Sequence, residues 1–507
     1  MSHHLPALLV IAPLLSAFLV SAAGWINRRF CFPIGVIGLG LSAYSALFIL
    51  LRVMNEGVVE YHLGGWAPPW GIAYLIDSLN ALVALLVTIV ALVNFIATVR
   101  DVREEFGAKV GQFYTLYLLM TTGLLGMVVT GDAFNLYVLL EIASLTGYGL
   151  ISMGDKRAPL AALNYVYMGT IGASFYLLGV GYLYIVTGSL NMADIASLLP
   201  DMYSTRPVFV AFIFCIVGVW VKMAFFPLHA WLPNAYTHAP NAASSLIAPL
   251  MTKVMIYVMI RIIFSIFTPT FVFYYPQFAI APVTIDEAVV WFASIAIVAG
   301  VVMALNQRNL KKMLTYIIVS EVGYMVGGIW LANRQGATGA ILHIVNDAMM
   351  TLCLFLAVGA IGYKLKTYHF DDLKGIFRKM PFTMACFAVG ALSIIGVPPT
   401  CGFFSKWYLI LGAIDAGHYG FMVALLFSSL VCVVLFFRIF EIGYYGDMTE
   451  AHGHGGSHGA AAAVIDEAPL SMLIPLVFVS VLLIALGLFT SNIVNSVIKY
   501  AIPTIVS

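Results

Sequence analysis

Charged side chains are scarce in this chain. Only 9% of its 507 residues are Asp, Glu, Lys or Arg, whereas 62% are hydrophobic. A water-soluble domain carries about a quarter charged residues, so the composition predicts a protein whose solvent is the lipid bilayer. The net charge of +1 gives no reason to expect a nucleic-acid partner.

Other absences narrow the functional classes. The six cysteines include no C-x-x-C pair, which argues against an iron–sulfur, metal or disulfide framework. No phosphate-binding or dinucleotide-binding glycine motif follows a predicted strand. We therefore expect no cofactor or metal, and no catalytic chemistry in this chain itself. Three histidines in the tract from Ala451 to Ala463 could bind a metal, but a flexible linker is the favoured interpretation.

Long apolar segments run through the whole chain, and each approaches the roughly 20 residues that cross a bilayer. They predict an all-α polytopic membrane protein with about fourteen spans, of which the seventh and twelfth are broken by proline. The first segment lacks the basic region of a signal peptide and is interpreted as a retained span. The expected spans are 5–23, 31–53, 73–99, 114–131, 133–153, 160–187, 208–232, 242–267, 285–305, 312–332, 337–362, 382–414, 419–445 and 469–490.

Lys and Arg are distributed unequally between the loops. The even-numbered loops hold only Arg52, Arg206 and Arg334. The positive-inside rule places the other side, the Lys/Arg-rich side, in the cytoplasm and both termini outside. We expect a multi-pass protein of a bacterial or archaeal cytoplasmic membrane, with residues 1–507 as a single membrane domain. The odd-numbered loops hold Arg28, Arg29, Arg100, Arg103, Lys109, Lys156, Arg157, Arg308, Lys311, Lys312, Lys364, Lys366, Lys374, Arg378 and Lys379.

A few ionisable residues lie inside the expected spans, where each charge costs at least about 2.5–3.5 kcal/mol. A static ion pair between helices is one interpretation. The alternative is a proton relay, because burial favours the neutral forms of Lys and Glu while an opposite charge favours the ionised forms. Making or breaking such a pair therefore changes proton affinity. The residues are Glu141, Lys222, Lys253, Glu321, His343, Asp347 and Lys406.

The two halves of the chain repeat one pattern. Glu141 and Glu321 are each followed by a Gly-Tyr pair, and Lys222 and Lys406 follow them by 81 and 85 residues. Each Lys span contains prolines, which free backbone carbonyls. Inverted repeats with broken helices are typical of transporters. The pattern predicts two inverted five-helix repeats, at 114–267 and 285–445, each supplying a half-channel from one side. One half would pair Glu141 with Lys222 and the other Glu321 with Lys406.

Four segments carry a family resemblance that extends from about residue 70 to about 490. They are GDAFNLYVLLEIASL, VKMAFFPLHAWLPNAYTHAP, NLKKMLTYIIVSEVGYM and GVPPTCGFFSKWYL. The chain resembles the antiporter-like membrane subunits of Mrp cation/proton antiporters, respiratory complex I and membrane-bound hydrogenases, and is most similar to the D-type subunits of Mrp antiporters.

The resemblance implies roles for individual residues. Glu141 would pair with Lys222, Lys253 would pass the proton onward, and Lys406 would exchange it with the far side. His238 matches a family histidine that follows the broken seventh helix. His229 and Asp132 are secondary candidates, and a packing or capping role for His229 is equally compatible with its place at a broken helix.

The eleventh and tenth expected spans depart from the family pattern. His343 is kept, but Asp347 stands where the family has a second His and Thr351 where it has Lys. Glu321 replaces a His or Gln. The central region therefore gains two carboxylates and loses a base. We hypothesise that Glu321, Asp347 and His343 form a modified, Na⁺-responsive site.

The leading functional hypothesis is a proton-conducting subunit of a multi-subunit Na⁺ or K⁺/proton antiporter. The second is a proton-pumping membrane-arm subunit of a redox-driven complex, a quinone oxidoreductase or a hydrogenase. Both imply other membrane subunits as partners, and both use the same Glu–Lys relay, so these residues do not separate them. A structural scaffold with an inactive relay is a third hypothesis, which the retained Glu and Lys residues disfavour.

Overall fold

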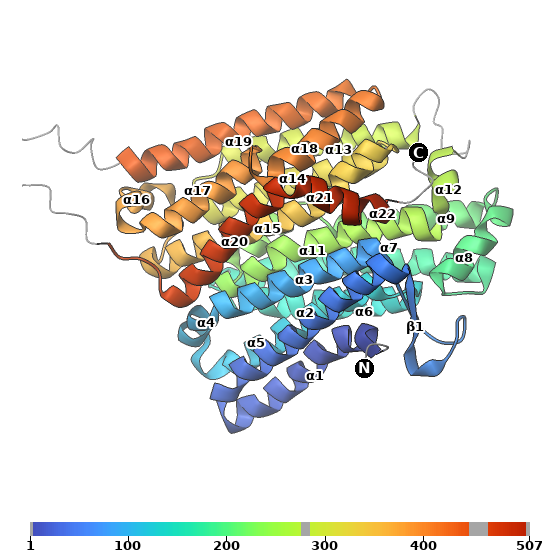
Figure 1. The fold of residues 1–507 in the computed structure, drawn as a ribbon, viewed down its shortest axis with the longest axis horizontal. Helices are drawn as coiled ribbons and strands as arrows, with labels where there is room; N and C mark the ends of the chain where they lie inside the picture. The colour runs from blue at the N-terminus through green and yellow to red at the C-terminus, as the bar shows by residue number, and fades with distance from the viewer. Residues whose placement is uncertain (1–3, 275–283, 446–464, 503–507) are drawn as a thin grey trace, which may run out of the picture.

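The computed structural model describes residues 4–274, 284–445 and 465–502. Its long helices run side by side along one direction (Figure 1). Within these residues, 12 helices are long and apolar enough to cross a membrane. The chain is therefore an all-α polytopic membrane protein. The number of fourteen spans and the inverted repeats remain predictions.

The first half contains one small hairpin and a series of helices. Its strands are β1 (Val59–His62) and β2 (Ala73–Ile76). Its helices are α1 (Leu5–Ile26), α2 (Cys31–Glu56), α3 (Ser78–Ala97), α4 (Val99–Phe106), α5 (Val110–Val129), α6 (Ala133–Ser152), α7 (Ala158–Thr187), α8 (Met192–Leu198), α9 (Arg206–Lys222), α10 (Leu232–His238), α11 (Asn241–Arg261) and α12 (Thr268–Tyr274).

The described part of the second half consists mainly of helices. It comprises α13 (Ile285–Leu305), α14 (Leu310–Trp330), α15 (Arg334–Leu365), α16 (Ile376–Lys379), α17 (Pro381–Ile395), α18 (Cys401–Asp415), α19 (Tyr419–Tyr445), α20 (Leu470–Leu488), α21 (Thr490–Ile493) and α22 (Lys499–Ala501). Short 3-10 or π turns join several of them, among which Ile262–Ile266 continues α11.

Two of the expected spans are interrupted, as their prolines predicted. The expected span 208–232 consists of α9, which ends at Lys222, and a non-helical stretch before α10. The expected span 382–414 is divided between α17 and α18 by residues 396–400. Proline provides no backbone N–H, so carbonyls near each break lack their helical partners. Both breaks lie next to a buried lysine.

The third expected span, 73–99, begins too early. Ala73–Ile76 forms β2, which pairs antiparallel with β1, and α3 begins only at Ser78. Asp77 caps α3 by accepting hydrogen bonds from the backbone N–H groups of Leu79 and Asn80 at 2.9 and 3.1 Å. An apolar β-strand resembles the first turn of a span, so the hydrophobic run alone placed this boundary too near the N-terminus.

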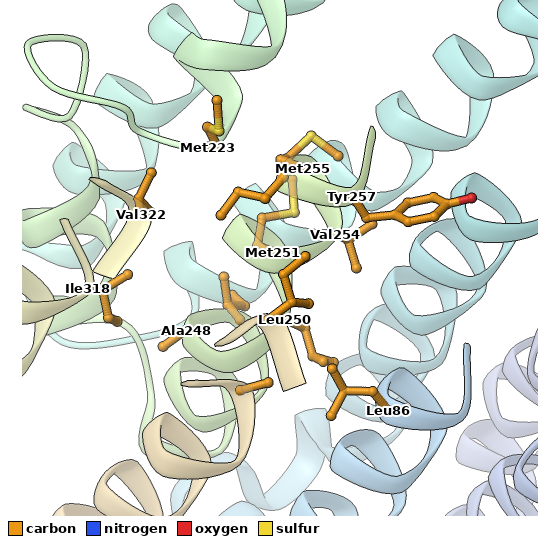
Figure 2. Packing of buried hydrophobic residues seen from close by; sticks show 14 of the residues in the cluster. Leu86, Met223, Ala248, Leu250, Met251, Val254, Met255, Tyr257, Ile318 and Val322 are labelled. Carbon is orange, nitrogen blue, oxygen red and sulfur yellow. The ribbon is translucent and has the colours of Figure 1, made fainter. Parts of the chain in front are cut away.

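Three helices form the centre of the molecule. α11, α14 and α15 are buried on almost all sides, and α15 packs against both α11 and α14. Methionines of α11 fill the space between Ile318 and Val322 of α14 and Leu86 of α3 (Figure 2), which suits the flexible thioether side chain. These three helices carry Lys253, Glu321, His343 and Asp347, so four of the expected ionisable residues lie in the core.

Candidate functional site

Lys222 lies at the C-terminal end of α9, where the helix breaks, and is fully buried. Its Nζ is 3.5 Å from Glu141 Oε1 of α6. It also donates hydrogen bonds to Ser144 Oγ at 2.7 Å and Tyr148 Oη at 3.3 Å. These partners all come from α6, spaced three and four residues apart on one helix face. The expected Glu141–Lys222 pair is therefore present.

Lys253 forms the central ion pair. Its Nζ lies 2.8 Å from Asp347 Oδ2, and both side chains are buried. Thr351, one turn further along α15, donates to the other Asp347 oxygen at 2.8 Å. Asp347 and Thr351, two of the three departures noted in the sequence, thus lie together on α15 and place a carboxylate against Lys253. A carboxylate at this position neutralises the lysine directly.

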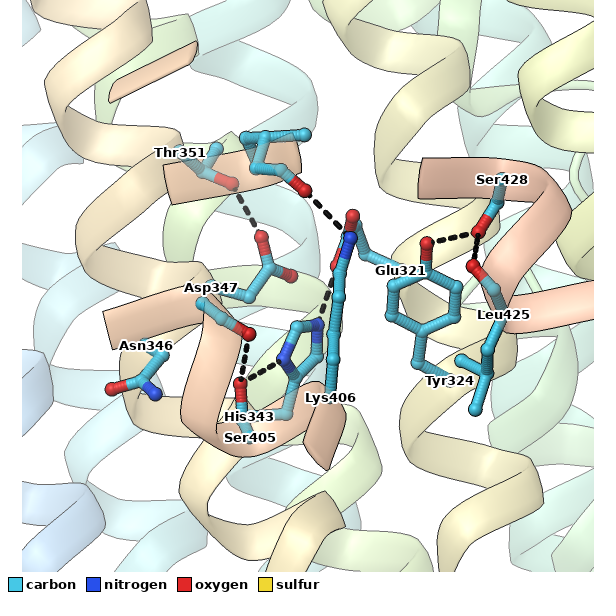
Figure 3. A network of polar contacts seen from close by, with 12 residues as sticks. Glu321, Tyr324, His343, Asn346, Asp347, Thr351, Ser405, Lys406, Leu425 and Ser428 are labelled. Atoms are coloured by element: carbon cyan, nitrogen blue, oxygen red, sulfur yellow. Dashed lines mark hydrogen bonds and ion pairs between the residues drawn. The ribbon is translucent and has the colours of Figure 1, made fainter. Parts of the chain in front are cut away.

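A second acid–base contact joins α14 to α15. Glu321 Oε2 contacts His343 Nε2, and the other imidazole nitrogen lies 2.8 Å from Ser405 Oγ of α18 (Figure 3). Both Glu321 and His343 are buried. Because one imidazole nitrogen faces a carboxylate and the other a hydroxyl, His343 can accept or donate a proton along this line.

Lys406 is held differently from Lys222. Its Nζ donates to the carbonyl oxygens of Ile394 at 2.6 Å and Ile395 at 3.5 Å, at the broken end of α17. It also donates to Ser429 Oγ at 3.1 Å and lies 5.0 Å from the centre of the Tyr324 ring. Its stabilising contacts are therefore dipoles and an aromatic face rather than a carboxylate.

The expected pairing of Glu321 with Lys406 is absent. Within the described residues Glu321 pairs with His343, and no ion pair joins it to Lys406. The expectation came from the sequence parallel with Glu141 and Lys222. It fails because the break at α17 provides Lys406 with carbonyl acceptors, while His343 of the adjacent helix occupies the carboxylate.

The remaining candidates lie away from the buried acid–base contacts. His238 ends α10, and its Nδ1 is 3.4 Å from Asp155 Oδ2. His229 lies in the break after α9, stacked on Phe226 at a ring distance of 5.1 Å. Asp132 caps α6 by accepting from Asn135 N at 2.6 Å, and burial raises the pKa of its carboxyl. Capping and packing thus account for the contacts of Asp132 and His229.

Sequence reasoning missed a second polar cluster, which lies around the start of α14. Lys311, assigned to a loop, is buried and donates to Ala239 O at 2.6 Å. Asn241 and Tyr368 lie beside it, and Asp101 of α4 faces it. Asp101 and Glu105 stand one turn apart in VRDVREEF, and this spacing is the signal that could have indicated a shared face. The histidine tract 451–463 lies outside the described residues.

Comparisons with known proteins agree on one family. Residues 130–432 match the family described as NADH:quinone oxidoreductase/Mrp antiporter, transmembrane. The N-type subunit of the NADH-quinone oxidoreductase of Desulforudis audaxviator is 40% identical over 99% of both chains. The D-type subunit of the Na⁺/H⁺ antiporter of Bacillus subtilis is 28% identical over 92% of both. A chain of the archaeal membrane-bound sulfane sulfur reductase superposes with a TM-score of 0.87 at 28% identity, covering 97% of this chain and 96% of that one.

Proposed function

Because the chain belongs to the family of membrane subunits shared by NADH:quinone oxidoreductases and Mrp antiporters, we propose that it is a proton-conducting subunit of a multi-subunit membrane complex. The observation that carries the proposal is a set of three acid–base contacts, Glu141–Lys222, Asp347–Lys253 and Glu321–His343. All of these side chains are buried except that of Glu141, which is 25% exposed. Ionisable residues inside a membrane are rare, and they mark ion pathways and proton relays.

Each buried base has a distinct task in this proposal. Lys222 releases its proton when its contact with Glu141 loosens, because the amine is otherwise desolvated. Lys253 receives the proton while Asp347 balances its charge. His343 then accepts it between Glu321 and Ser405, and Lys406 holds it beside the freed carbonyls before release. Each transfer moves one proton and restores the preceding group to its starting state.

The two repeats at 114–267 and 285–445 belong to the same proposal. Their support is the parallel placement of a buried lysine at a helix break, at the end of α9 in one half and after α17 in the other. Each lysine also lies near a tyrosine ring, Tyr148 at 5.8 Å and Tyr324 at 5.0 Å. One lysine precedes its break and the other follows it, which fits halves of opposite direction.

For the parent complex we propose a monovalent cation/proton antiporter with Na⁺ or K⁺ as the exchanged cation. The supporting observation is the pair of core carboxylates, Glu321 and Asp347, both buried within the described helices. Carboxylate oxygen is the ligand that hard cations prefer. Glu321, Asp347 and His343 would form the Na⁺-responsive site.

A redox-driven complex is the second candidate. It is supported by the 40% identity, over the full length, with the N-type subunit of an NADH-quinone oxidoreductase. In such a complex the same relay would move protons when partner subunits transfer electrons. In either case the chain would lie in a bacterial or archaeal cytoplasmic membrane beside other membrane subunits, with both termini outside as the loop charges predict.

Purification of the intact complex from its native membrane tests the proposal. Only small hydrophobic subunits, together with proton movement driven by a Na⁺ or K⁺ gradient in vesicles, would support the antiporter. Flavin or iron–sulfur subunits and redox-driven proton movement would support the second candidate. A complex that moves no protons under either driving force would contradict the proposed function.

Replacement of the two core carboxylates tests the cation site. Glu321→Gln and Asp347→Asn are expected to weaken the dependence of proton movement on Na⁺, because each removes an anionic oxygen. Asp371→Asn is the matched control, since Asp371 is an exposed carboxylate of the connecting segment. An unchanged Na⁺ dependence in both core variants would contradict the cation site while leaving proton conduction intact.

A further inference from the structure

The polar cluster at the start of α14 is not used by the relay described above. Lys311 sits in the first turn of this helix, with only 2% of its surface exposed. Its Nζ donates to Ala239 O at 2.6 Å and lies 3.5 Å from Asn241 Oδ1. It is also 5.6 Å from the centre of the Tyr368 ring. Among the described residues, the Lys311 ammonium thus contacts a carbonyl, an amide and an aromatic ring rather than a carboxylate.

Three carboxylates nevertheless lie within electrostatic range of this lysine. Asp101, Glu105 and Asp155 all act on Lys311 electrostatically. Asp101 is the most enclosed of them, with 8% of its surface exposed, and its Oδ2 has no hydrogen-bond partner among the described residues. A buried carboxylate oxygen normally has a partner. Asp101 therefore holds an unpaired acceptor oxygen within electrostatic range of the buried Lys311.

The other charged groups of the cluster lie at its rim. Glu105 is exposed one turn along α4. Glu104 accepts a hydrogen bond from Tyr363 Oη at 2.7 Å, and Lys366 lies over the Tyr363 ring. His238 and Asp155 contact each other nearby. The carboxylates of the cluster thus range from exposed at the rim to buried at Asp101, and Lys311 lies at the buried end.

A line of polar groups leads from the cluster toward the central ion pair. Asn241, which accepts from Tyr368 Oη at 2.5 Å, is the first residue of α11. Ser245 follows one turn later and donates to Asn94 Oδ1 at 2.7 Å. Pro249 lacks the N–H that would bond the Ser245 carbonyl. Lys253 then reaches the Ala248 carbonyl at 3.4 Å, so polar atoms accompany α11 over about 18 Å.

We propose that Asp101 and Lys311 form a proton-loading site on the Lys/Arg-rich side. It is a second source of protons for Lys253, which reaches that lysine along the polar face of α11 and is separate from the transfer from Lys222. The Lys311 ammonium gives its proton inward and is reprotonated by the Asp101 carboxyl. Asp101 then takes a proton from the exposed rim, so each cycle moves one proton and restores both groups. This inference rests on the proposed function, because it assumes that Lys253 belongs to a proton pathway.

The test measures proton movement by the reconstituted complex as the proton concentration is varied on each side separately. Asp101→Asn keeps the size of the side chain and its capacity for hydrogen bonding. It removes the carboxylate that accepts the proton. It is expected to raise the apparent KM for protons on the Lys/Arg-rich side by about tenfold or more, since an opposite charge beside an ionisable group changes proton affinity by at least that factor. The maximal rate should change by less than about twofold, because the downstream relay is untouched.

Control variants separate this role from structural damage. Asp371→Asn removes an exposed carboxylate, and Lys312→Gln removes the partly exposed lysine that follows Lys311. Both variants should have the apparent KM and maximal rate of the parent. Lys311→Arg keeps the charge but cannot release its proton, so it should slow movement at every proton concentration while leaving the melting temperature near that of the parent.

The outcomes distinguish this inference from the proposed function. If Lys253→Met with Asp347→Leu stops proton movement and Asp101→Asn leaves the apparent KM unchanged, or changes it equally on both sides, the loading site is wrong and the relay stands. If Lys253→Met with Asp347→Leu leaves proton movement unchanged, the proposed function fails first. A KM shift confined to the Lys/Arg-rich side supports the loading site.

Discussion

The two buried lysines at helix breaks, Lys222 and Lys406, occupy similar places and have different partners. Lys222 faces a carboxylate, Glu141, and two hydroxyls of the same helix. Lys406 faces two backbone carbonyls, a serine and an aromatic ring. In the first half a counter-charge controls the lysine, whereas in the second half the carboxylate is held by His343. A repeated sequence pattern in the two halves therefore does not produce the same contacts around each lysine.

The central pair between the halves should give the largest effect. Lys253→Ala leaves Asp347 buried without its counter-ion and is expected to destabilise the fold by about 3–5 kcal/mol. The double variant Lys253→Met with Asp347→Leu removes both charges and should recover most of that loss. Thermal unfolding of the purified complex measures both. Equal destabilisation by the single and double variants would show that the loss of stability does not come from leaving Asp347 unpaired.

Removal of either lysine tests whether both halves conduct. Lys222→Ala and Lys406→Ala are each expected to slow proton movement by roughly a hundredfold or more, the usual contribution of a positioned proton-transfer group. Proton movement in vesicles is the measurement, and Lys379→Ala, at an exposed lysine, is the control. If only Lys222→Ala has an effect, the second half is not part of the pathway. If neither has one, the chain is a scaffold with an inactive relay.

The two glutamates should respond unequally. Glu141→Gln removes the counter-charge of Lys222 and is expected to slow proton movement about tenfold, because an adjacent charge shifts proton affinity by at least that factor. Glu321→Gln keeps a hydrogen-bond acceptor for His343 and leaves the Lys406 contacts intact, so a smaller loss is expected in the absence of Na⁺. Equal losses would mean that Glu321 acts on Lys406 despite the absence of a direct pair.

The two tyrosines give the smallest and most selective comparison. Tyr148 Oη accepts a hydrogen bond from Lys222, whereas Tyr324 Oη bonds Ser428 and offers Lys406 its ring. Tyr148→Phe should therefore cost about 1 kcal/mol of lysine stabilisation and slow proton movement several-fold. Tyr324→Phe keeps the ring and should change the rate less. The reverse order would contradict the assigned contacts.

Much of the fold followed from composition. Apolar segments of span length predicted the long helices, and the prolines predicted the breaks beside Lys222 and Lys406, because both rest on local physical requirements. The hairpin at Ala73–Ile76 was missed because a short apolar strand and a helix start have the same composition. The boundary became clear only from the Asp77 cap.

The pairing of acids with bases could not be predicted in the same way. It depends on how α14, α15 and α18 are rotated against one another, which close packing determines. A Cβ on Gly339 of α15 would lie 2.7 Å from the backbone N of Leu409, so glycine lets α18 approach and brings Ser405 to His343. The burial of Lys311 was missed for a related reason. This lysine follows a loop in the sequence, yet its side chain packs against the residues that precede α11 and donates to Ala239 O.

In the proposed relay, protons pass between the two halves through the Lys253–Asp347 pair. The most direct test is proton movement by the reconstituted complex that carries Lys253→Met and Asp347→Leu together. This variant should unfold near the temperature of the parent, so any loss of transport reflects the missing link. Proton movement is expected to stop while the complex stays assembled. Proton movement at the parental rate would contradict it.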